Sequence, residues 1–194
     1  IHLLARAFLA PPGFSPKEDG AIPGALLMTP TYGEYRGACL LAGGTVSELE
    51  ADRERGFRWD LAEARRRIAG NVTETVPKPI SLPGKPSDER PSLVFLCNPN
   101  NPTGVYLSHE EVQALAQACA EAGALLVVDE AYLNFVDSPW DSLDLLESEA
   151  RGEYDAGRFQ AAIEMFDEVV TRMEGDLGPD HPRTLANRND LARA

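Results

Sequence analysis

The clearest pattern in the chain is a pair of continuous apolar runs with an amphipathic stretch between them. Residues 92–97 (SLVFLC) and 124–128 (ALLVV) show no polar alternation, which is typical of strands buried on both faces of a parallel sheet. Residues 108–122 have helical periodicity, and Ser108 with Glu111 forms the capping-box signature of a helix start. A strand, a helix and a second strand in this order predict a parallel unit and therefore an α/β fold.

Shorter elements precede this unit. Asp60 is the predicted N-cap of a helix, and residues 71–91 have many prolines and no periodicity, so we expect an inserted loop there. The first helical pattern begins without a capping residue, so we expect further chain before it. The remaining patterns predict strands at 25–28 and 45–49 and helices at 1–8, 35–41 and 61–68.

The pattern changes towards the C-terminus. Two consecutive amphipathic helices are expected there, separated by a break at 156–158 and followed by a turn at 177–182. A third helical pattern begins at Thr184, and no strand is expected in this part. We therefore predict two domains, an α/β domain over residues 1–146 and an all-α tail over residues 147–194.

The chain is acidic, which bears on its partners. It has 31 Asp and Glu against 18 Lys and Arg in 194 residues, a net charge of −13. Nucleic acid is bound by clustered basic side chains, whereas the densest basic run here, residues 65–67, is typical of the solvated face of a helix. We therefore expect no nucleic-acid partner.

The three cysteines, Cys39, Cys97 and Cys119, lie in apolar runs without metal-ligand spacing. We expect them to be small core residues, and we predict no metal site. No signal peptide and no apolar stretch of membrane-spanning length occur in the sequence. The expected location is the cytoplasm, without a membrane partner.

Candidate chemistry lies where the predicted strands end. The segments 30–33 (PTYG), 98–104 (NPNNPTG) and 129–132 (DEAY) each follow a strand, and open α/β sheets bind ligands at that edge. Together they offer an aromatic ring, amide groups, a carboxylate and a phenol. These groups suit a flat, charged heterocycle that stacks on the aromatic ring and pairs a ring N–H with the carboxylate.

These segments resemble the pyridoxal-phosphate enzymes of the aspartate-aminotransferase fold, especially the histidinol-phosphate aminotransferase branch. The resemblance is carried by FLCNPNNPTG at 95–104, LVVDEAYLNF at 126–135 and the PTYGEY segment around Tyr32, and it covers residues 1–146. It implies an incomplete aminotransferase-type large domain with a mostly parallel sheet. It also implies pyridoxal phosphate as cofactor and an amino acid or amino-phosphate as substrate. A relative of the threonine-phosphate decarboxylases fits the same motifs.

The resemblance implies a role for four residues. Asp129 would pair with the pyridine nitrogen and keep it protonated, so that the ring withdraws electrons. Tyr132 and Asn101 would hydrogen-bond the phenolic oxygen of the ring, and Tyr32 would stack on its face. The alternative structural roles are a strand-terminal cap for Asp129 and an ordinary turn aromatic for Tyr32.

The resemblance also implies a Schiff-base lysine beyond the DEAY segment. Residues 137–166 contain no lysine, and the lysines of the chain are Lys17, Lys78 and Lys85. We therefore assign no catalytic residue. We expect this aminotransferase-like part to be incomplete. Without a lysine that forms a Schiff base with the cofactor, transamination cannot begin and the protein would be inactive.

The tail resembles a second family, the tetratricopeptide repeats of the kinesin-light-chain type. The resemblance is carried by the AGRF segment at 156–159 and LGPDHPRTL at 177–185, and it covers residues 148–194. It implies a protein partner bound through the tail. The alternative to an enzyme is thus an interaction module with the α/β part as scaffold, and a decayed reading frame is a third possibility. A homodimer is also expected.

Overall fold

The chain divides into two compact units, Ile1–Pro139 and Trp140–Ala194. The computed structural model describes residues 1–9, 22–71, 80, 87–155, 157, 159–176 and 178–193. Lys17, Lys78 and Lys85 lie outside the described residues. The predicted domain division between residues 146 and 147 stays a prediction.

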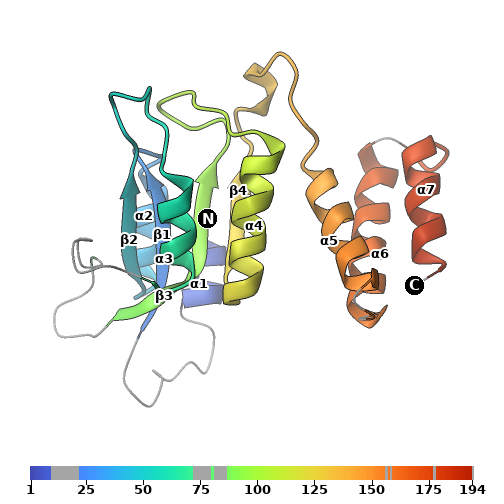
Figure 1. Cartoon of the computed structure of the whole chain (residues 1–194), viewed down its shortest axis with the longest axis horizontal. Helices are drawn as coiled ribbons and strands as arrows, with labels where there is room; N and C mark the ends of the chain where they lie inside the picture. The colour runs from blue at the N-terminus through green and yellow to red at the C-terminus, as the bar shows by residue number, and fades with distance from the viewer. Residues whose placement is uncertain are drawn as a thin grey trace. The chain divides into compact units, whose positions relative to one another are not determined.

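The first unit is built around a four-stranded sheet with the strand order β2-β1-β3-β4. All three neighbouring pairs are parallel, so the predicted α/β class with a mostly parallel sheet is confirmed. Figure 1 shows the four strands running side by side. Their bounds are Ile22–Thr29 for β1, Thr45–Glu50 for β2, Ser87–Cys97 for β3 and Leu125–Asp129 for β4.

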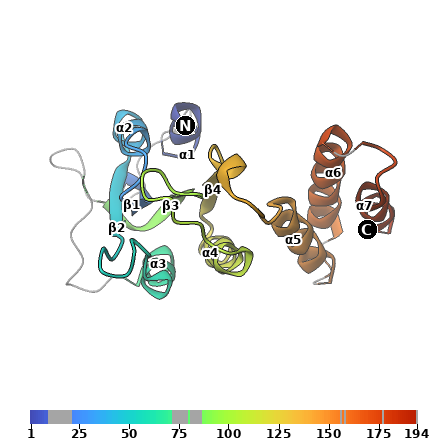
Figure 2. The ribbon, with the colours of Figure 1, turned by 90° about the horizontal axis from the view of Figure 1, so that it is seen from above.

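Helices cover both faces of this sheet. Seen from above, α1 and α2 lie on one face and α3 and α4 on the other (Figure 2). Residues 25–28 of β1 and 93–97 of β3 are apolar and buried because each face of the sheet packs against a helix layer there. The buried core includes Leu27, Leu93 and Phe95 together with Tyr35 of α2. The helices are α1 (His2–Leu9), α2 (Glu34–Leu41), α3 (Leu61–Ile68) and α4 (His109–Ala122).

The helix starts predicted at Asp60 and Ser108 are confirmed by their capping bonds. Asp60 accepts a hydrogen bond from the backbone N–H of Glu63, 3.0 Å away, at the start of α3. At the start of α4, the Ser108 hydroxyl accepts from the Glu111 N–H, and the Glu111 carboxylate accepts from the Ser108 N–H at 2.8 Å. These bonds satisfy backbone donors that have no partner inside the helix.

Replacing Ser108 with alanine is expected to lower the free energy of unfolding by about 1 kcal/mol, because the Glu111 N–H loses its acceptor. Urea unfolding followed by tryptophan fluorescence measures this loss. Ser108→Gly serves as the control, since glycine at an N-cap leaves the helix end open to water and costs only about a few tenths of a kcal/mol. Equal losses in the two variants would contradict the capping role.

The predicted loop at 71–91 is wrong at its C-terminal end, because β3 already begins at Ser87. Ile22 pairs with Ser87 and Gly24 pairs with Pro91, with register shifts on both sides of the Gly24 pairing. A proline cannot donate to the ladder and is tolerated at such irregularities. Pairing with β1 therefore extends the strand through a charged SDERP sequence that has no strand pattern of its own. Residues 72–79 and 81–86 lie outside the described part.

The three cysteines are free and buried, as expected for core residues. Their exposed fractions are 0% for Cys39, 3% for Cys97 and 2% for Cys119. Burial raises the pKa of the Cys39 thiol to about 11 and that of the Cys119 thiol to about 12. Both thiols are therefore neutral and unreactive at neutral pH.

The described residues of the second unit form three helices: α5 (Leu143–Asp155), α6 (Phe159–Asp176) and α7 (Pro182–Leu191). Three helices agree with the predicted pattern, but α7 begins at Pro182, before the predicted start at Thr184, because His181 is its N-cap. One small apolar cluster joins Leu143 to Val169 and Met173. A second joins Ala150, Ala162 and Phe166. The predicted break at 156–158 falls between α5 and α6, with residues 156 and 158 outside the described residues. Among the helices that the structure describes, none is long and apolar enough to cross a membrane.

Candidate functional site

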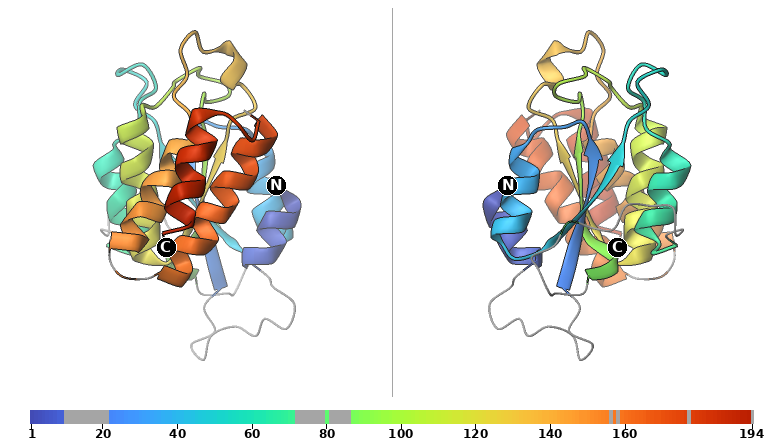
Figure 3. Two further views of the ribbon diagram at one scale, coloured as in Figure 1. Left: turned by 90° about the vertical axis from the view of Figure 1, so that its right-hand side faces the viewer. Right: turned by 90° about the vertical axis from the view of Figure 1, so that its left-hand side faces the viewer.

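The carboxyl ends of the strands gather the predicted site residues at one edge of the sheet. Cys97 at the end of β3 pairs with Asp129 at the end of β4. The segments that follow β3 and β4 lie at this same end, at the top of the views in Figure 3. The backbone N–H of Asn98 donates to the Asp129 carbonyl at 2.9 Å, which fixes the NPNNPTG loop against the DEAY segment.

The Asp129 carboxylate is held by two donors from different elements. Its Oδ1 accepts from the Ala131 N–H at 3.0 Å, and its Oδ2 accepts from the Tyr35 hydroxyl at 2.7 Å. An ionised carboxylate has about four acceptor positions. Two of these are filled here, so Asp129 retains capacity for a ring N–H.

Asn101 and Tyr132 meet through their side chains. The Asn101 amide nitrogen donates to the Tyr132 hydroxyl at 3.2 Å. Tyr132 is 41% exposed, so its phenol faces solvent and is not a core group. An amide N–H and a phenol O–H that lie this close can both donate to one oxygen of a bound molecule.

Tyr32 lies in the turn after β1 and is 44% exposed. Its ring makes an edge contact with the ring of Tyr35, with centroids 5.7 Å apart and planes at 83°. Tyr35 thereby contacts both Tyr32 and Asp129. The structure thus brings the four predicted residues together as two groups, Tyr32 with Asp129 through Tyr35, and Asn101 with Tyr132.

Three further residues shape the site without having been predicted. Asn98 closes the NPNNPTG loop, because its Oδ1 accepts from the Leu107 N–H at 2.7 Å. The Asn100 amide donates to the Pro30 carbonyl at 2.8 Å and thereby ties this loop to the segment of Tyr32. Tyr35 is the third. It is the second tyrosine of the PTYGEY segment, and the resemblance of that segment to a known family implies no role for it.

A cavity of about 720 Å³ opens at the carboxyl ends of β1 and β2. Tyr32 lines this cavity, whereas Asp129, Asn101 and Tyr132 do not. Three arginines line it as well, Arg36, Arg53 and Arg67. Arg36 and Arg67 already pair with Glu48 and Glu63 respectively. The cavity therefore borders the site on the side of the Tyr32 ring.

The groups at this edge fit a pyridine ring with a phenolic oxygen. Asp129 offers an acceptor for the ring N–H, Asn101 and Tyr132 offer donors for the oxygen, and Tyr32 offers an exposed aromatic ring for stacking. Burial, together with the bond to Asp129, raises the pKa of Tyr35 well above its usual range, so Tyr35 remains a donor to the carboxylate. Within the described residues, no group of three or more His, Cys, Asp or Glu side chains is placed to hold a metal ion.

The chain matches a known protein family over most of its length. The family model for aminotransferase class I and II matches residues 21–153. A histidinol-phosphate aminotransferase of Maricaulis maris is 44% identical over 174 residues, which cover 89% of this chain and 34% of the relative. One of Ruminiclostridium cellulolyticum is 30% identical over 113 residues, which cover 58% of this chain and 26% of the relative.

A solved structure shares the fold. Aspartate aminotransferase from Thermus thermophilus with maleate superposes with a TM-score of 0.51 and 25% identity, covering 71% of this chain and 28% of that one. The chain thus spans about a third or less of the length of these relatives. The matched residues 21–153 make up more than half of the chain and include all four predicted site residues. The chain belongs to the class I and II aminotransferases, a pyridoxal-phosphate-dependent family.

Proposed function

We propose that this chain forms the part of a pyridoxal-phosphate-dependent aminotransferase that holds the pyridine ring of the cofactor. The observation that carries this proposal is the Asp129 carboxylate, fixed by two donors at the end of β4. A carboxylate held in this way needs no further rearrangement to accept a ring N–H. The family match, which includes Asp129, supports the same assignment.

Each of the four residues has one task in this proposal. Asp129 pairs with the ring nitrogen and holds a proton there, Asn101 and Tyr132 hydrogen-bond the phenolic oxygen, and Tyr32 packs against the ring face. The bound cofactor supplies an electron-withdrawing ring that stabilises negative charge on the amino substrate. No catalytic residue of this chain is assigned, because residues 137–166 contain no lysine that could form the Schiff base.

The proposed substrate is an amino acid or amino-phosphate. Two relatives carry the name histidinol-phosphate aminotransferase, which favours a substrate with both an amino group and a phosphate group. The expected homodimer and the cytoplasmic location stay predictions.

The alternative function, a protein-binding module built on a tetratricopeptide-like tail, has less support. The family match extends to residue 153 and so enters the predicted tail. Charged side chains of the tail are also engaged within their own unit, since Arg183 pairs with Asp141, Asp144 and Glu147. The tetratricopeptide assignment and its protein partner therefore remain a secondary proposal that rests on the helical pattern.

Binding of pyridoxamine phosphate tests the proposed function. This form of the cofactor carries an amine in place of the aldehyde, so it cannot form an imine with Lys17, Lys78 or Lys85. A saturable change in its fluorescence is expected with the wild-type chain. Asp129→Asn is expected to weaken binding by about ten-fold or more, because a hydrogen bond to a charged group contributes about 1.5–3 kcal/mol.

The matched control is Asp137→Asn, the same chemical change at an exposed aspartate of the same unit. It is expected to leave the affinity unchanged. The proposal is wrong if the wild-type chain does not bind the probe, or if the two variants weaken binding equally.

A further inference from the structure

Tyr35 is a buried phenol at the centre of the candidate site. Its side chain extends from α2 into the core, and the residue is 1% exposed. Its ring stacks on Phe95 of β3, with centroids 4.9 Å apart and planes at 8°. Its hydroxyl lies 2.7 Å from the Asp129 Oδ2, and its ring edge contacts Tyr32. One side chain therefore contacts two of the four residues assigned to the cofactor.

The geometry restricts what Tyr35 can do. Stacking on Phe95 fixes the plane of the phenol, so the direction of its hydroxyl is set by the core and not by solvent. The Ala131 N–H holds the other carboxylate oxygen of Asp129. With one donor on each oxygen, from α2 and from the turn after β4, the carboxylate plane is fixed and its free acceptor positions point in a defined direction.

A structural explanation alone accounts for part of this arrangement. A buried phenol needs a hydrogen-bond partner, and any acceptor within reach would satisfy it. The partner here, however, is the one carboxylate that the site requires, and it lies 94 residues away in the sequence. The same ring also abuts the exposed aromatic residue that is proposed to stack on the cofactor.

We propose that Tyr35 is a positioning residue of the cofactor site: its hydroxyl orients the Asp129 carboxylate towards the pyridine nitrogen, and its ring edge orients Tyr32. Tyr35 thereby links the two interactions with the cofactor, the pairing of Asp129 with the ring nitrogen and the stacking of Tyr32 on the ring face. This inference rests on the proposed function, because it takes Asp129 as the residue that meets the cofactor. Tyr35 itself does not touch the cofactor.

A double-mutant cycle on pyridoxamine phosphate binding separates positioning from simple structural support. Tyr35→Phe keeps the ring stacked on Phe95 and removes only the hydroxyl. It is expected to weaken binding by about ten-fold in the wild-type background, as the loss of a hydrogen bond to a charged group does. In the Asp129→Asn background, Tyr35→Phe is expected to weaken binding by less than about three-fold. The reason is that Tyr35 acts on binding through the Asp129 carboxylate, which this background has already lost. Equal factors in both backgrounds would overturn the positioning role.

A second measurement uses the free protein. The Tyr35 hydroxyl proton, buried in a 2.7 Å bond, is expected to give a slowly exchanging downfield NMR signal. The signal should be absent in Tyr35→Phe and lost or shifted in Asp129→Ala. Unchanged far-UV circular dichroism shows that the variants are folded. A signal that is unaffected by Asp129→Ala would overturn the proposed pairing.

The outcomes distinguish this inference from the proposed function. If the wild-type chain binds the probe and Tyr35→Phe binds equally well, the positioning role fails while the proposed function stands. If the wild-type chain shows the hydroxyl signal but does not bind the probe, the proposed function fails and the positioning role fails with it.

Discussion

Replacing Phe95 with alanine is expected to lower the free energy of unfolding of the α/β unit by about 3–5 kcal/mol. Phe95 is 1% exposed and lies in the central strand β3, opposite Leu27 of β1 and Val127 of β4. Its ring also supports Tyr35 by stacking. Removing it leaves a cavity under the helix layer, and the surrounding strands can close such a cavity only in part.

Urea unfolding measures this loss through the fluorescence of Trp59, which is buried in the same unit. Trp140, the other tryptophan, is replaced by phenylalanine in all variants so that one unit is observed. Phe135→Ala is the matched control, because Phe135 is 82% exposed and its removal should cost less than about 0.5 kcal/mol. Similar losses at the two positions would mean that Phe95 is not part of a packed core.

The elements with a strong local pattern are those that the sequence predicts best. The runs at 92–97 and 124–128 lie in strands β3 and β4, and the capping box at Ser108 starts a helix, because an apolar run and a capping box leave direct traces in the residues. Residues 93–97 of β3 are buried as predicted, whereas the prediction of burial on both faces is wrong for β4, which lies at the edge of the sheet and is half-buried along its length. The start of β3 at Ser87 has no such trace. It depends on pairing with β1, a neighbour about sixty-five residues earlier, and no local pattern encodes that contact.

In the candidate site, too, some residues are predictable from local sequence and others depend on distant contacts. Tyr32, Asn101, Asp129 and Tyr132 could be singled out because strand ends of a parallel sheet converge and because their motifs resemble a known family. The residues that hold them were not predictable from local sequence. Tyr35 reaches Asp129 across 94 positions, and Asn100 reaches Pro30 across 70. Hydrogen bonds between such distant positions depend on the strand order and on the packing of α2 against the sheet, which the local sequence pattern does not specify.

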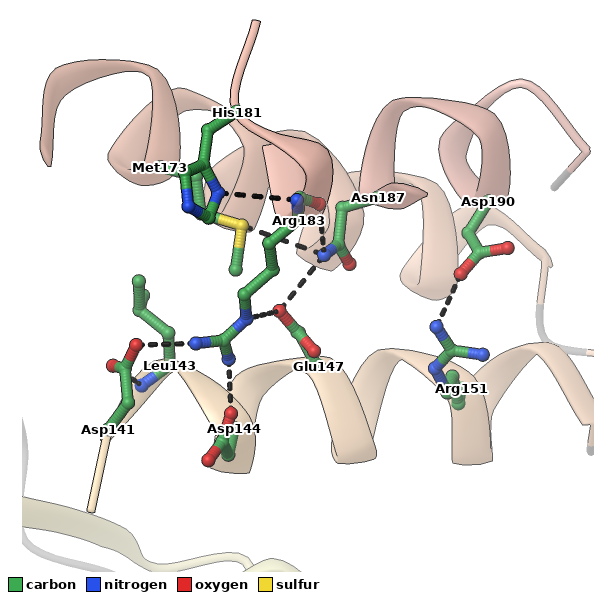
Figure 4. Close-up of polar contacts among 10 residues, drawn as sticks. All are labelled: Asp141, Leu143, Asp144, Glu147, Arg151, Met173, His181, Arg183, Asn187 and Asp190. Carbon is green, nitrogen blue, oxygen red and sulfur yellow. Dashed lines mark hydrogen bonds and ion pairs between the residues drawn. The ribbon is translucent and has the colours of Figure 1, made fainter. Parts of the chain in front are cut away.

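In the tail, periodicity predicts the helices but not their polar contacts. Arg183 stands near the start of α7, where the sequence indicates only a turn and a helix. Its guanidinium meets three carboxylates from the segment that begins α5 (Figure 4). The three bonds go to Asp141 at 2.5 Å, to Glu147 at 2.8 Å and to Asp144.

Replacing Arg183 with glutamine is therefore expected to lower the free energy of unfolding of the helical unit by about 2 kcal/mol. Exposed ion pairs contribute about 0–1 kcal/mol, and breaking a buried pair costs about 3–5 kcal/mol. The Arg183 side chain is 26% exposed and that of Glu147 is 18% exposed, so the expected value lies between these limits. The loss has two sources: the guanidinium bonds disappear, and three carboxylates are left without the cation that separates their charges.

Peptide-level hydrogen exchange across α7 measures this change as an increase in local opening. Arg151→Gln is the matched control, because Arg151 makes one bond to Asp190 at 2.6 Å and its side chain is 56% exposed (Figure 4). Its loss should cost less than about 1 kcal/mol.

The salt dependence is a second test of the cluster, because about 1 M NaCl screens the repulsion among the three carboxylates that remain in Arg183→Gln. The effect of Arg183→Gln should therefore shrink in high salt, and an effect that equals the Arg151→Gln loss at low salt would refute the role given to the cluster.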